Sequence, residues 1–167
     1  AGNDVSDTAL SSVYSVRWRA KRRHCESRGS ALTPKRAPRT VYLETSFLSY
    51  LVARPPPEPL LLSRQQSTAE WWSDHGSRWD PYVSFAVLRE AGAGDGVAAS
   101  RRLEIARDLP VLALDEVAAQ LAEGLLVQGA VPQKAAEDAI HIAIAARHGM
   151  DCLLTWNFKH IANPFLW

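Results

Sequence analysis

Hydrophobic and polar positions along residues 40–167 follow the pattern of short buried strands separated by helices. Runs rich in β-branched, aromatic or aliphatic side chains predict four strands, at 40–43, 81–84, 110–114 and 152–155. Strands that alternate with helices form parallel sheets with helices packed on both faces. The pattern therefore predicts an α/β fold around a central parallel sheet.

Helices are expected at 46–53, 60–74, 85–91, 97–107, 115–127 and 132–148. The first of them must end at the prolines of RPPPEP, because proline clashes with a continuing helix. Asp115 is placed to cap the fifth helix, and Gly129 and Gly149 are placed to end the last two. The glycines of GAGDG, at 92–96, indicate a loop, and the sequence has no glycine-rich phosphate-binding motif.

The stretch VYLETS, at 41–46, ends an apolar strand with a carboxylate, Glu44. In open parallel sheets the ligand site lies outside the carboxyl ends of the strands. Glu44 follows the first expected strand and Asn157 follows the last, so we expect both at this edge of the sheet. A charge in that position belongs to a site rather than to the core.

The helix expected in KAAEDAIHIAIAARHG, at 134–149, is apolar from Ala139 to Ala146 except for His141. A helix that is apolar nearly all round is buried. Asp138 lies at the edge of this buried stretch. A carboxylate there is expected to be paired or to bind a metal ion, because an unpaired buried charge is costly or shifts its pKa.

A fourth polar side chain, Glu90, closes the apolar stretch YVSFAVLRE just after the second expected strand. Glu44, Glu90, Asp138 and Asn157 thus each bring one oxygen-bearing side chain to a strand end or a facing helix. Oxygen ligands are those that Mg²⁺ and Mn²⁺ prefer. Such an ion would relieve the repulsion between the acids, activate water and stabilise charge on a phosphodiester.

Each of these residues also has an ordinary structural interpretation. Glu44 could cap the helix that follows it, and Glu90 could be a solvated helix residue. Asp138 could pair with Lys134, four residues earlier on the same helix face. Asn157 could be a turn residue.

Aromatic side chains and a histidine offer two further candidates. His141 is more typical of a hydrogen-bonded core histidine than of a ligand. Trp71, Trp72 and Trp79 could stack on nucleic-acid bases, but at helical spacing they are more typical of packing.

Composition limits the class of protein. The chain has 167 residues, of which 47% are hydrophobic, which is enough for one domain with a sizeable core. No apolar run is long enough to span a membrane, and the N-terminal residues lack the apolar segment of a signal peptide. Cys25 and Cys152 are far apart in the sequence, so we expect a reduced, cytoplasmic protein without a disulfide framework.

Charge divides the chain into two parts. Residues 1–39 have nine Lys or Arg and three Asp or Glu, a net charge of +6, whereas residues 40–167 have a net charge of −5. The basic segment is poor in large aliphatic residues, so we expect a disordered extension. Such a tail could bind nucleic acid through phosphates, or it could be an unstructured extension or an upstream translation artefact.

Three motifs together resemble a known family. VYLETSFLSYL, the VLRE stretch and AAEDAIHIAIAARHGMDCLLTWNFKHIAN are similar to those of PIN domains, most closely to the VapC-like ribonucleases of toxin–antitoxin pairs. The resemblance covers about residues 40 to 163. It implies a three-layer α/β/α sandwich with a parallel sheet, RNA cleavage that depends on Mg²⁺ or Mn²⁺, inhibition by a cognate antitoxin, and a homodimer.

The resemblance also assigns roles to particular residues. Glu44, Glu90 and Asp138 match the three metal-binding acids, Ser46 matches a small hydroxyl residue beside the first acid, and Asn157 falls where members have Asp or Asn. The family's first acid is usually Asp, so the longer Glu44 would shift or weaken the metal. The expected function is hydrolysis of RNA by metal-activated water, and the alternative is a degenerate domain that binds antitoxin or RNA without cutting.

The end of the chain departs from the family pattern. Members usually continue for another strand and helix after the segment that matches HIAN, whereas this sequence reads PFLW and stops. We therefore expect residues 40–167 to form a PIN-like nuclease domain with a truncated C-terminus.

Overall fold

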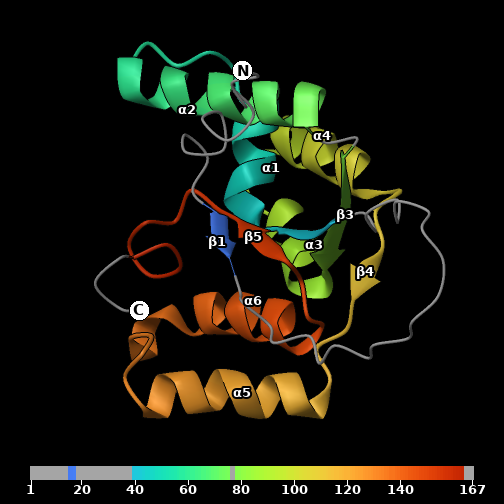
Figure 1. The fold of residues 1–167 in the computed structure, drawn as a ribbon. Coiled ribbons are helices and arrows are strands. Elements are labelled where there is room, and N and C mark those ends of the chain that lie inside the picture. The colour runs from blue at the N-terminus through green and yellow to red at the C-terminus, as the bar shows by residue number, and fades with distance from the viewer. Residues whose placement is uncertain (1–14, 18–38, 76–77, 164–167) are drawn as a thin grey trace, which may run out of the picture.

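A computed structural model describes residues 15–17, 39–75 and 78–163 of the chain. These residues form a five-stranded sheet in the order β1-β5-β2-β3-β4 (Figure 1). The strands are β1 (Ser15–Arg17), β2 (Arg39–Leu43), β3 (Trp79–Ser84), β4 (Val111–Leu112) and β5 (Cys152–Leu154). Strands β5, β2, β3 and β4 run parallel, and β1 lies antiparallel at the edge beside β5.

The strand order contains one reversal. The chain passes from β2 to β3 and β4 on one side, and then returns to place β5 on the other side of β2. The carboxyl ends of β2 and β5 meet at this topological switch point, with Leu43 paired with Leu154. Ligand sites of open α/β sheets lie outside such a point, because the connections leave it in opposite directions.

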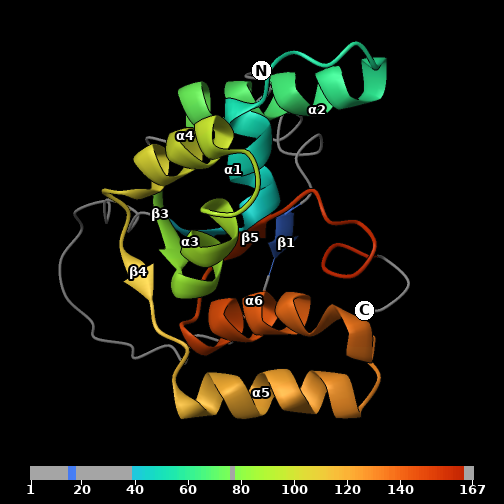
Figure 2. The ribbon, with the colours of Figure 1, turned by 180° about the vertical axis from the view of Figure 1, so that it is seen from behind.

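Helices cover both faces of the sheet. The helices between β2 and β4 are α1 (Thr45–Val52), α2 (Pro59–Glu70), α3 (Phe85–Ala91) and α4 (Gly96–Ala106), with a π-helical turn at Trp71–His75. The helices before β5 are α5 (Glu116–Val127) and α6 (Ala136–Arg147), with a 3₁₀ turn at Gln133–Ala135. In both views α5 and α6 lie below the sheet and α1, α2 and α4 lie above it (Figures 1 and 2). The arrangement is α/β and is compatible with a three-layer α/β/α sandwich.

Local sequence explains where the helices begin. The carboxylates of Asp95 and Asp115 accept hydrogen bonds from Ala98 N at 2.9 Å and Ala118 N at 2.8 Å, at the starts of α4 and α5. Such side-chain caps satisfy amides that have no partner within the helix. The cap at Asp115 confirms the prediction from sequence.

Glycine ends α6 as expected. Gly149 has φ +65°, a conformation that other residues adopt at a steric penalty. It allows Gly149 N and Met150 N to donate to the last carbonyl groups of the helix, Ala146 O at 3.1 Å and Ala145 O at 3.0 Å. The turn directs the chain into β5, and so fixes where β5 ends.

The core lies between the sheet and the two helical layers. The expected apolar helix is confirmed, since the α6 side chains from Ala139 to Ala145, apart from half-buried Ile140, are buried. Trp71 and Trp79 are also buried in the core, and Trp72 packs against it. The tryptophans therefore serve packing, as expected, although Trp79 lies in β3 rather than at helical spacing.

The boundaries of several elements differ from prediction, and β3 begins at Trp79, two residues earlier than expected. The 60–74 helix ends as an α-helix at Glu70, and the strand expected at 110–114 is paired only at Val111–Leu112. The helix expected from residue 132 begins at Ala136, after the 3₁₀ turn. Helix ends often tighten or widen by a turn, so these shifts leave the order of elements unchanged.

Both ends of the chain lie largely outside the described residues. Of the segment expected to be a disordered extension, Ser15–Arg17 forms β1 and Arg39 begins β2. The other residues of 1–39 and residues 164–167, where a truncated C-terminus is expected, are not described. No helix of the described part combines the length and apolar character needed to cross a membrane.

Candidate metal centre

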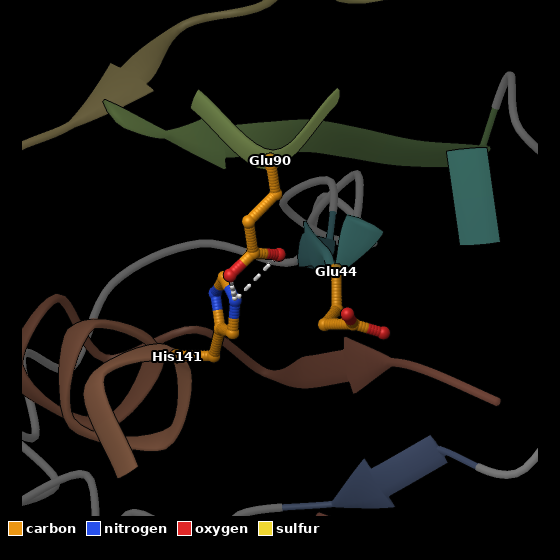
Figure 3. Close-up of side chains that lie close together, drawn as sticks. All are labelled: Glu44, Glu90 and His141. Carbon is orange, nitrogen blue, oxygen red and sulfur yellow. Dashed lines mark hydrogen bonds and ion pairs between the residues drawn. The ribbon is translucent and has the colours of Figure 1, made fainter. Parts of the chain in front are cut away.

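Three side chains from separate elements meet at the switch point of the sheet. Glu44 directly follows β2, Glu90 lies in the last turn of α3, and His141 lies in the middle of α6. Each offers one ligand atom, and these atoms all lie within 4.8 Å of one another (Figure 3). The sheet and two helices therefore bring together donors that are about 50 residues apart in the sequence.

Glu44 is a buried carboxylate with one satisfied oxygen. Its side chain accepts hydrogen bonds at Oε2 from Thr155 Oγ1, at 2.8 Å, and from Ser46 Oγ. Its Oε1 accepts no hydrogen bond from the described residues, although Glu44 is only 6% exposed. Oε1 is nevertheless not among the fully buried, unpartnered polar atoms of the described residues, so solvent or a cation can reach it.

Glu90 is better supported and more open to solvent. Thr45 Oγ1 donates to its Oε2, and His141 Nε2 lies 3.2 and 3.3 Å from its two oxygens. Partial burial alone would raise the pKa of Glu90, but the hydrogen bonds from His141 and Thr45 and the charges of His141 and Arg89 lower it below its usual value. Glu90 is therefore ionised at neutral pH and reachable, with its side chain 27% exposed.

His141 is held at both ring nitrogens. Its Nδ1 lies 2.8 Å from Tyr42 Oη, and Tyr42 Oη lies 2.7 Å from Ser84 Oγ. Burial alone would lower the pKa of His141, but the hydrogen bond and charge of Glu90, followed by the charges of Glu44 and Asp138, raise it. The imidazole thus lies in a strongly negative environment that favours a cation.

Tyr42 completes this buried chain as a neutral hydroxyl. Burial is the main cause that raises the pKa of Tyr42 far above its ordinary value of 10.0. The phenol is therefore protonated at neutral pH, and can accept from one neighbour while it donates to the other. Ser84 in turn caps α3 by accepting from Val87 N at 3.3 Å, so the chain is anchored to the backbone.

Asp138 lies in a second polar group beside the first. Its Oδ1 accepts from Asn157 Nδ2 at 3.0 Å, and its Oδ2 lies 2.7 Å from His160 Nδ1. Asp138 is not part of the donor group formed by Glu44, Glu90 and His141. The structure thus brings together two of the three acids expected to bind metal, and places the third in a separate pair.

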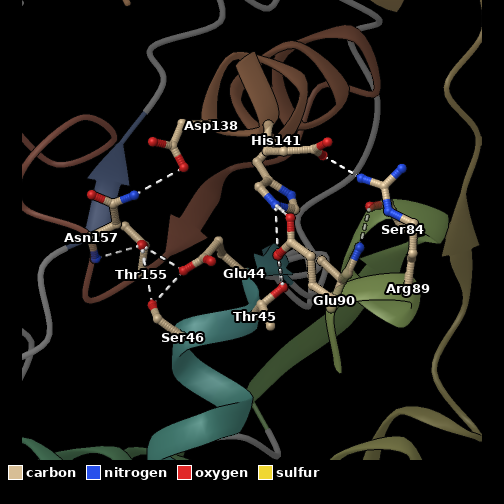
Figure 4. Close-up of polar contacts among 12 residues, drawn as sticks. Glu44, Thr45, Ser46, Ser84, Arg89, Glu90, Asp138, His141, Thr155 and Asn157 are labelled. Atoms are coloured by element: carbon tan, nitrogen blue, oxygen red, sulfur yellow. Dashed lines mark hydrogen bonds and ion pairs between the residues drawn. The ribbon is translucent and has the colours of Figure 1, made fainter. Parts of the chain in front are cut away.

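Thr155 links the two polar groups. It donates to Glu44 and accepts from Asn157 N at 2.9 Å, while Asn157 holds Asp138 (Figure 4). Ser46 accepts from Trp156 N at 2.8 Å in addition to donating to Glu44. The segment after β5 therefore positions Glu44 directly and Asp138 through Asn157.

The contacts of Glu44, Glu90 and Asp138 bear on their alternative structural roles. Glu44 is the residue before α1, but its side chain makes no capping hydrogen bond. Glu90 is not simply solvated, since His141 and Thr45 bind it. Asp138 has Asn157 and His160 as its partners rather than Lys134.

Asn157 has both of the roles considered from sequence. Its Oδ1 accepts from Lys159 N at 3.2 Å and His160 N at 3.1 Å, which makes it a turn residue. Its Nδ2 reaches Asp138 at the same time. The turn thus brings the His160 ring and the Asn157 amide to one carboxylate.

Sequence reasoning placed His141 in the core and did not select Thr155, Thr45 or His160. One signal was available, because Asp138 and His141 are three residues apart and so share a helix face. Thr45 directly follows Glu44, and Thr155 directly follows the last residue of β5. Their contacts with Glu44 and Glu90 depend on how distant segments meet, which local patterns do not reveal.

A divalent cation fits the Glu44, Glu90 and His141 group chemically. Two carboxylates and an imidazole are ordinary ligands of divalent ions, and Oε1 of Glu44, which accepts no hydrogen bond from the described residues, is available to an ion. The surrounding hydrogen bonds from Thr45, Ser46 and Thr155 orient the donors, as residues around metal ligands commonly do.

Comparisons with known proteins add no identity. No protein-family model matches the chain, and neither a curated protein nor a solved structure matches it. The architecture and the geometry of the Glu44 group are therefore the observations on which any assignment of function rests.

Proposed function

We propose that this chain is a divalent-metal-dependent ribonuclease of the PIN type that hydrolyses RNA phosphodiesters. The observation that carries the proposal is the convergence of Glu44, Glu90 and His141 at the carboxyl edge of a parallel sheet. Residues 40–167 would be the nuclease domain. The sequence motifs quoted above support the family, and the donor group supports the metal dependence.

Each residue of the group has a distinct part in this proposal. Glu44, fixed at Oε2 by Thr155, binds the ion through Oε1. Glu90 is the more exposed acid, so it binds the ion from the solvent side or orients the attacking water. When bound, the ion supplies Lewis acidity, lowers the pKa of water and offsets charge on the phosphate.

The second polar group lies where it can assist the same reaction. Asp138 and Asn157 are expected site residues of the family pattern, and Thr155 connects them to Glu44. Asp138 holds the His160 ring, which is 15% exposed. We propose that this pair orients substrate or solvent beside the ion, with Ser46 supporting Glu44.

RNA is the substrate class that the motifs favour, and exposed cations near the site are consistent with a phosphate backbone. Arg89 precedes Glu90 and forms an exposed ion pair with Glu137. Lys159 follows the Asn157 turn and is exposed. Lys and Arg side chains of this kind supply much of the affinity of proteins for nucleic acids.

The toxin–antitoxin assignment extends the proposal to protein partners. It includes a cognate antitoxin, a homodimer and action in the cytoplasm. Apolar side chains are exposed on β4, on α5 and on the link between them, at Val111, Leu114, Val117 and Leu121, and such surface would suit a protein partner. The mass of the full chain in solution, measured by light scattering, tests the dimer directly.

A second candidate is a degenerate domain that binds RNA or an antitoxin without cutting. The observation that favours it is the pairing of Asp138 with Asn157 and His160, which leaves two carboxylates rather than three in the donor group. Metal binding without RNA cleavage would support this candidate.

The test is cleavage of a structured RNA by the full chain with Mn²⁺ or Mg²⁺, and with EDTA. Two variants accompany it: Glu44→Gln, which removes the buried charge, and Glu123→Gln, which changes an exposed acid of α5. The proposal expects cleavage that EDTA and Glu44→Gln abolish and Glu123→Gln leaves unchanged. Cleavage that survives EDTA, or no cleavage by a folded chain, contradicts it.

A further inference from the structure

The third member of the donor group is a nitrogen, and this bears on which metal the site selects. Carboxylates and water suit Mg²⁺, whereas imidazole suits first-row transition ions such as Fe²⁺, Co²⁺, Ni²⁺ and Zn²⁺. His141 is only 1% exposed, and its Nε2 faces Glu90. Its ligand atom lies within 4.8 Å of those of Glu44 and Glu90. One ion between the three would therefore meet an imidazole.

The buried hydroxyl chain behind His141 prepares Nε2 for this role. Tyr42 lies 2.8 Å from Nδ1, and Ser84 lies 2.7 Å from the Tyr42 hydroxyl. When Nδ1–H donates to Tyr42 and Tyr42 donates to Ser84, Nε2 carries the lone pair of the neutral ring. Metal-binding histidines commonly have their other nitrogen held in this way, which fixes tautomer and ring orientation.

Independent support comes from Glu44. Its Oε1 accepts no hydrogen bond from the described residues and is open to solvent, so it is available to a cation. In Figure 3 the carboxylate lies beside Glu90 and His141. An ion that His141 and Glu90 bind would also satisfy this oxygen.

We propose that His141 binds the metal directly through Nε2, held by Tyr42 and Ser84, and that the site therefore selects a first-row transition ion over Mg²⁺. The inference rests on the metal site of the proposed function. Where Nε2 is protonated and donates to Glu90, that proton leaves to solvent on binding, and the lone pair of Nε2 then goes to the metal. Nδ1 keeps its proton throughout.

The first experiment compares affinities for Co²⁺, Zn²⁺ and Mg²⁺ by calorimetric titration of the full chain. The unmodified chain is expected to bind Co²⁺ and Zn²⁺ more tightly than Mg²⁺. Loss of a residue that only supports a metal ligand typically lowers metal affinity by about 10-fold to 100-fold. Because His141 is proposed as a direct ligand, His141→Gln should weaken Zn²⁺ binding by at least that much. The same substitution should change Mg²⁺ affinity less, so the ratio of Zn²⁺ affinity to Mg²⁺ affinity should fall.

Two further variants separate ligation from packing. Tyr42→Phe keeps the buried ring and removes the hydroxyl that holds Nδ1, so Zn²⁺ affinity should fall by about 10-fold. His148→Gln changes another histidine, directly after the last residue of α6, whose Nε2 lies 2.9 Å from the Ala113 carbonyl oxygen. This control should keep both the affinity and the selectivity of the unmodified chain.

The second experiment needs no substitution at a buried position. The full chain is labelled with ¹⁵N-histidine, and its imidazole resonances are recorded before and after addition of Zn²⁺. The His141 Nε2 resonance should move to the range of a metal-bound nitrogen while Nδ1 stays protonated. If Zn²⁺ binds and Nε2 stays protonated beside Glu90, the inference is overturned.

The outcomes also distinguish this inference from the proposed function. Zn²⁺ ligation by His141 without RNA cleavage would support the inference and contradict the nuclease. RNA cleavage with equal affinity for Mg²⁺ and Zn²⁺, unchanged in His141→Gln, would support the nuclease and overturn the inference. No metal binding would overturn both.

Discussion

The two polar groups at the carboxyl edge of the sheet are built from similar residues but differ in how well they are satisfied. In the first group, Glu44 and Glu90 have one imidazole between them, and Oε1 of Glu44 accepts no hydrogen bond from the described residues and is open to solvent. In the second group, the two oxygens of Asp138 each have a partner, in Asn157 and His160. The first group has two carboxylates and one imidazole, so a cation would offset its remaining negative charge. In the second group, Asn157 and His160 already contact both oxygens of Asp138.

This difference separates the two groups in function. A cation stabilises a site most where carboxylates would otherwise repel one another in a buried place. We therefore expect the metal at Glu44, and expect Asp138 to act on substrate or solvent beside it. Thr155 is hydrogen-bonded to both Glu44 and Asn157, so a substitution in one group should also affect the other group.

The largest expected effect is that of removing the charge of Glu44. Glu44→Gln should lower Mn²⁺ affinity by more than about 100-fold, beyond the range for residues that only support a ligand. The metal-free variant should be about as stable as the unmodified chain, because the Gln oxygen can still accept from Ser46 and Thr155. Calorimetric titration measures the Mn²⁺ affinity, and urea denaturation measures the free energy of unfolding. An unchanged Mn²⁺ affinity would show that Glu44 does not bind the metal.

Asp138→Asn should have a smaller and different effect. Cleavage of RNA should fall by about 10-fold to 100-fold, as expected for a residue that positions others, while Mn²⁺ affinity changes little. Parallel cleavage and calorimetric measurements provide the test. If Mn²⁺ affinity falls as much as in Glu44→Gln, Asp138 is a direct ligand and the two groups are one metal site.

The link between the groups should be weaker still. Thr155→Val removes the hydroxyl that binds Glu44 Oε2 and keeps the shape of the side chain. Because Ser46 still donates to that oxygen, the expected loss in free energy of unfolding is about 1 kcal/mol. Thr155→Ser retains a hydroxyl and is the matched control. Equal stability of the Val and Ser variants in urea would show that the link contributes nothing.

The smallest expected effect is a dependence of stability on pH. His141 has a folded pKa above its ordinary value of 6.5, so its contribution is full below pH 6.5 and is lost as pH rises through the folded pKa. Glu90 has a folded pKa below its ordinary value of 4.5, so its contribution is present above pH 4.5 and is lost as pH falls through the folded pKa. The pair thus stabilises the metal-free chain most between pH 4.5 and 6.5.

Urea denaturation at several pH values, with EDTA present, measures this dependence. The free energy of unfolding should fall as pH rises above 6.5, and His141→Gln should remove that part of the slope. A slope that persists in His141→Gln would assign the titration to another group.

Part of this molecule was visible in the sequence because it follows from local patterns. Runs of β-branched, aromatic and aliphatic residues located the parallel strands, and Asp115 and Gly149 marked helix ends by mechanisms that act within one turn. Glu44 and Glu90 were found because each ends an apolar stretch beside a strand. The rule that sites lie at the carboxyl ends of parallel strands was then enough to bring them together.

The rest depends on contacts that no local pattern determines. His141 was assigned to the core because it lies in an apolar helix, and only the packing of α6 against β2 and α3 places it between Tyr42 and Glu90. Asp138 was expected among the ligands, but the turn after Asn157 brings His160 and an amide to its oxygens. The position of that turn follows from how β5 enters the sheet.

The central claim is that Glu44, Glu90 and His141 form one divalent metal centre. Calorimetric titration of Mn²⁺ into the full chain tests it most directly, with Glu44→Gln, Glu90→Gln and the Glu123→Gln control beside it. The account predicts binding that each of the first two substitutions abolishes and the third leaves unchanged. Binding that is unaffected by both Glu44→Gln and Glu90→Gln, or no binding by the folded chain, would contradict it.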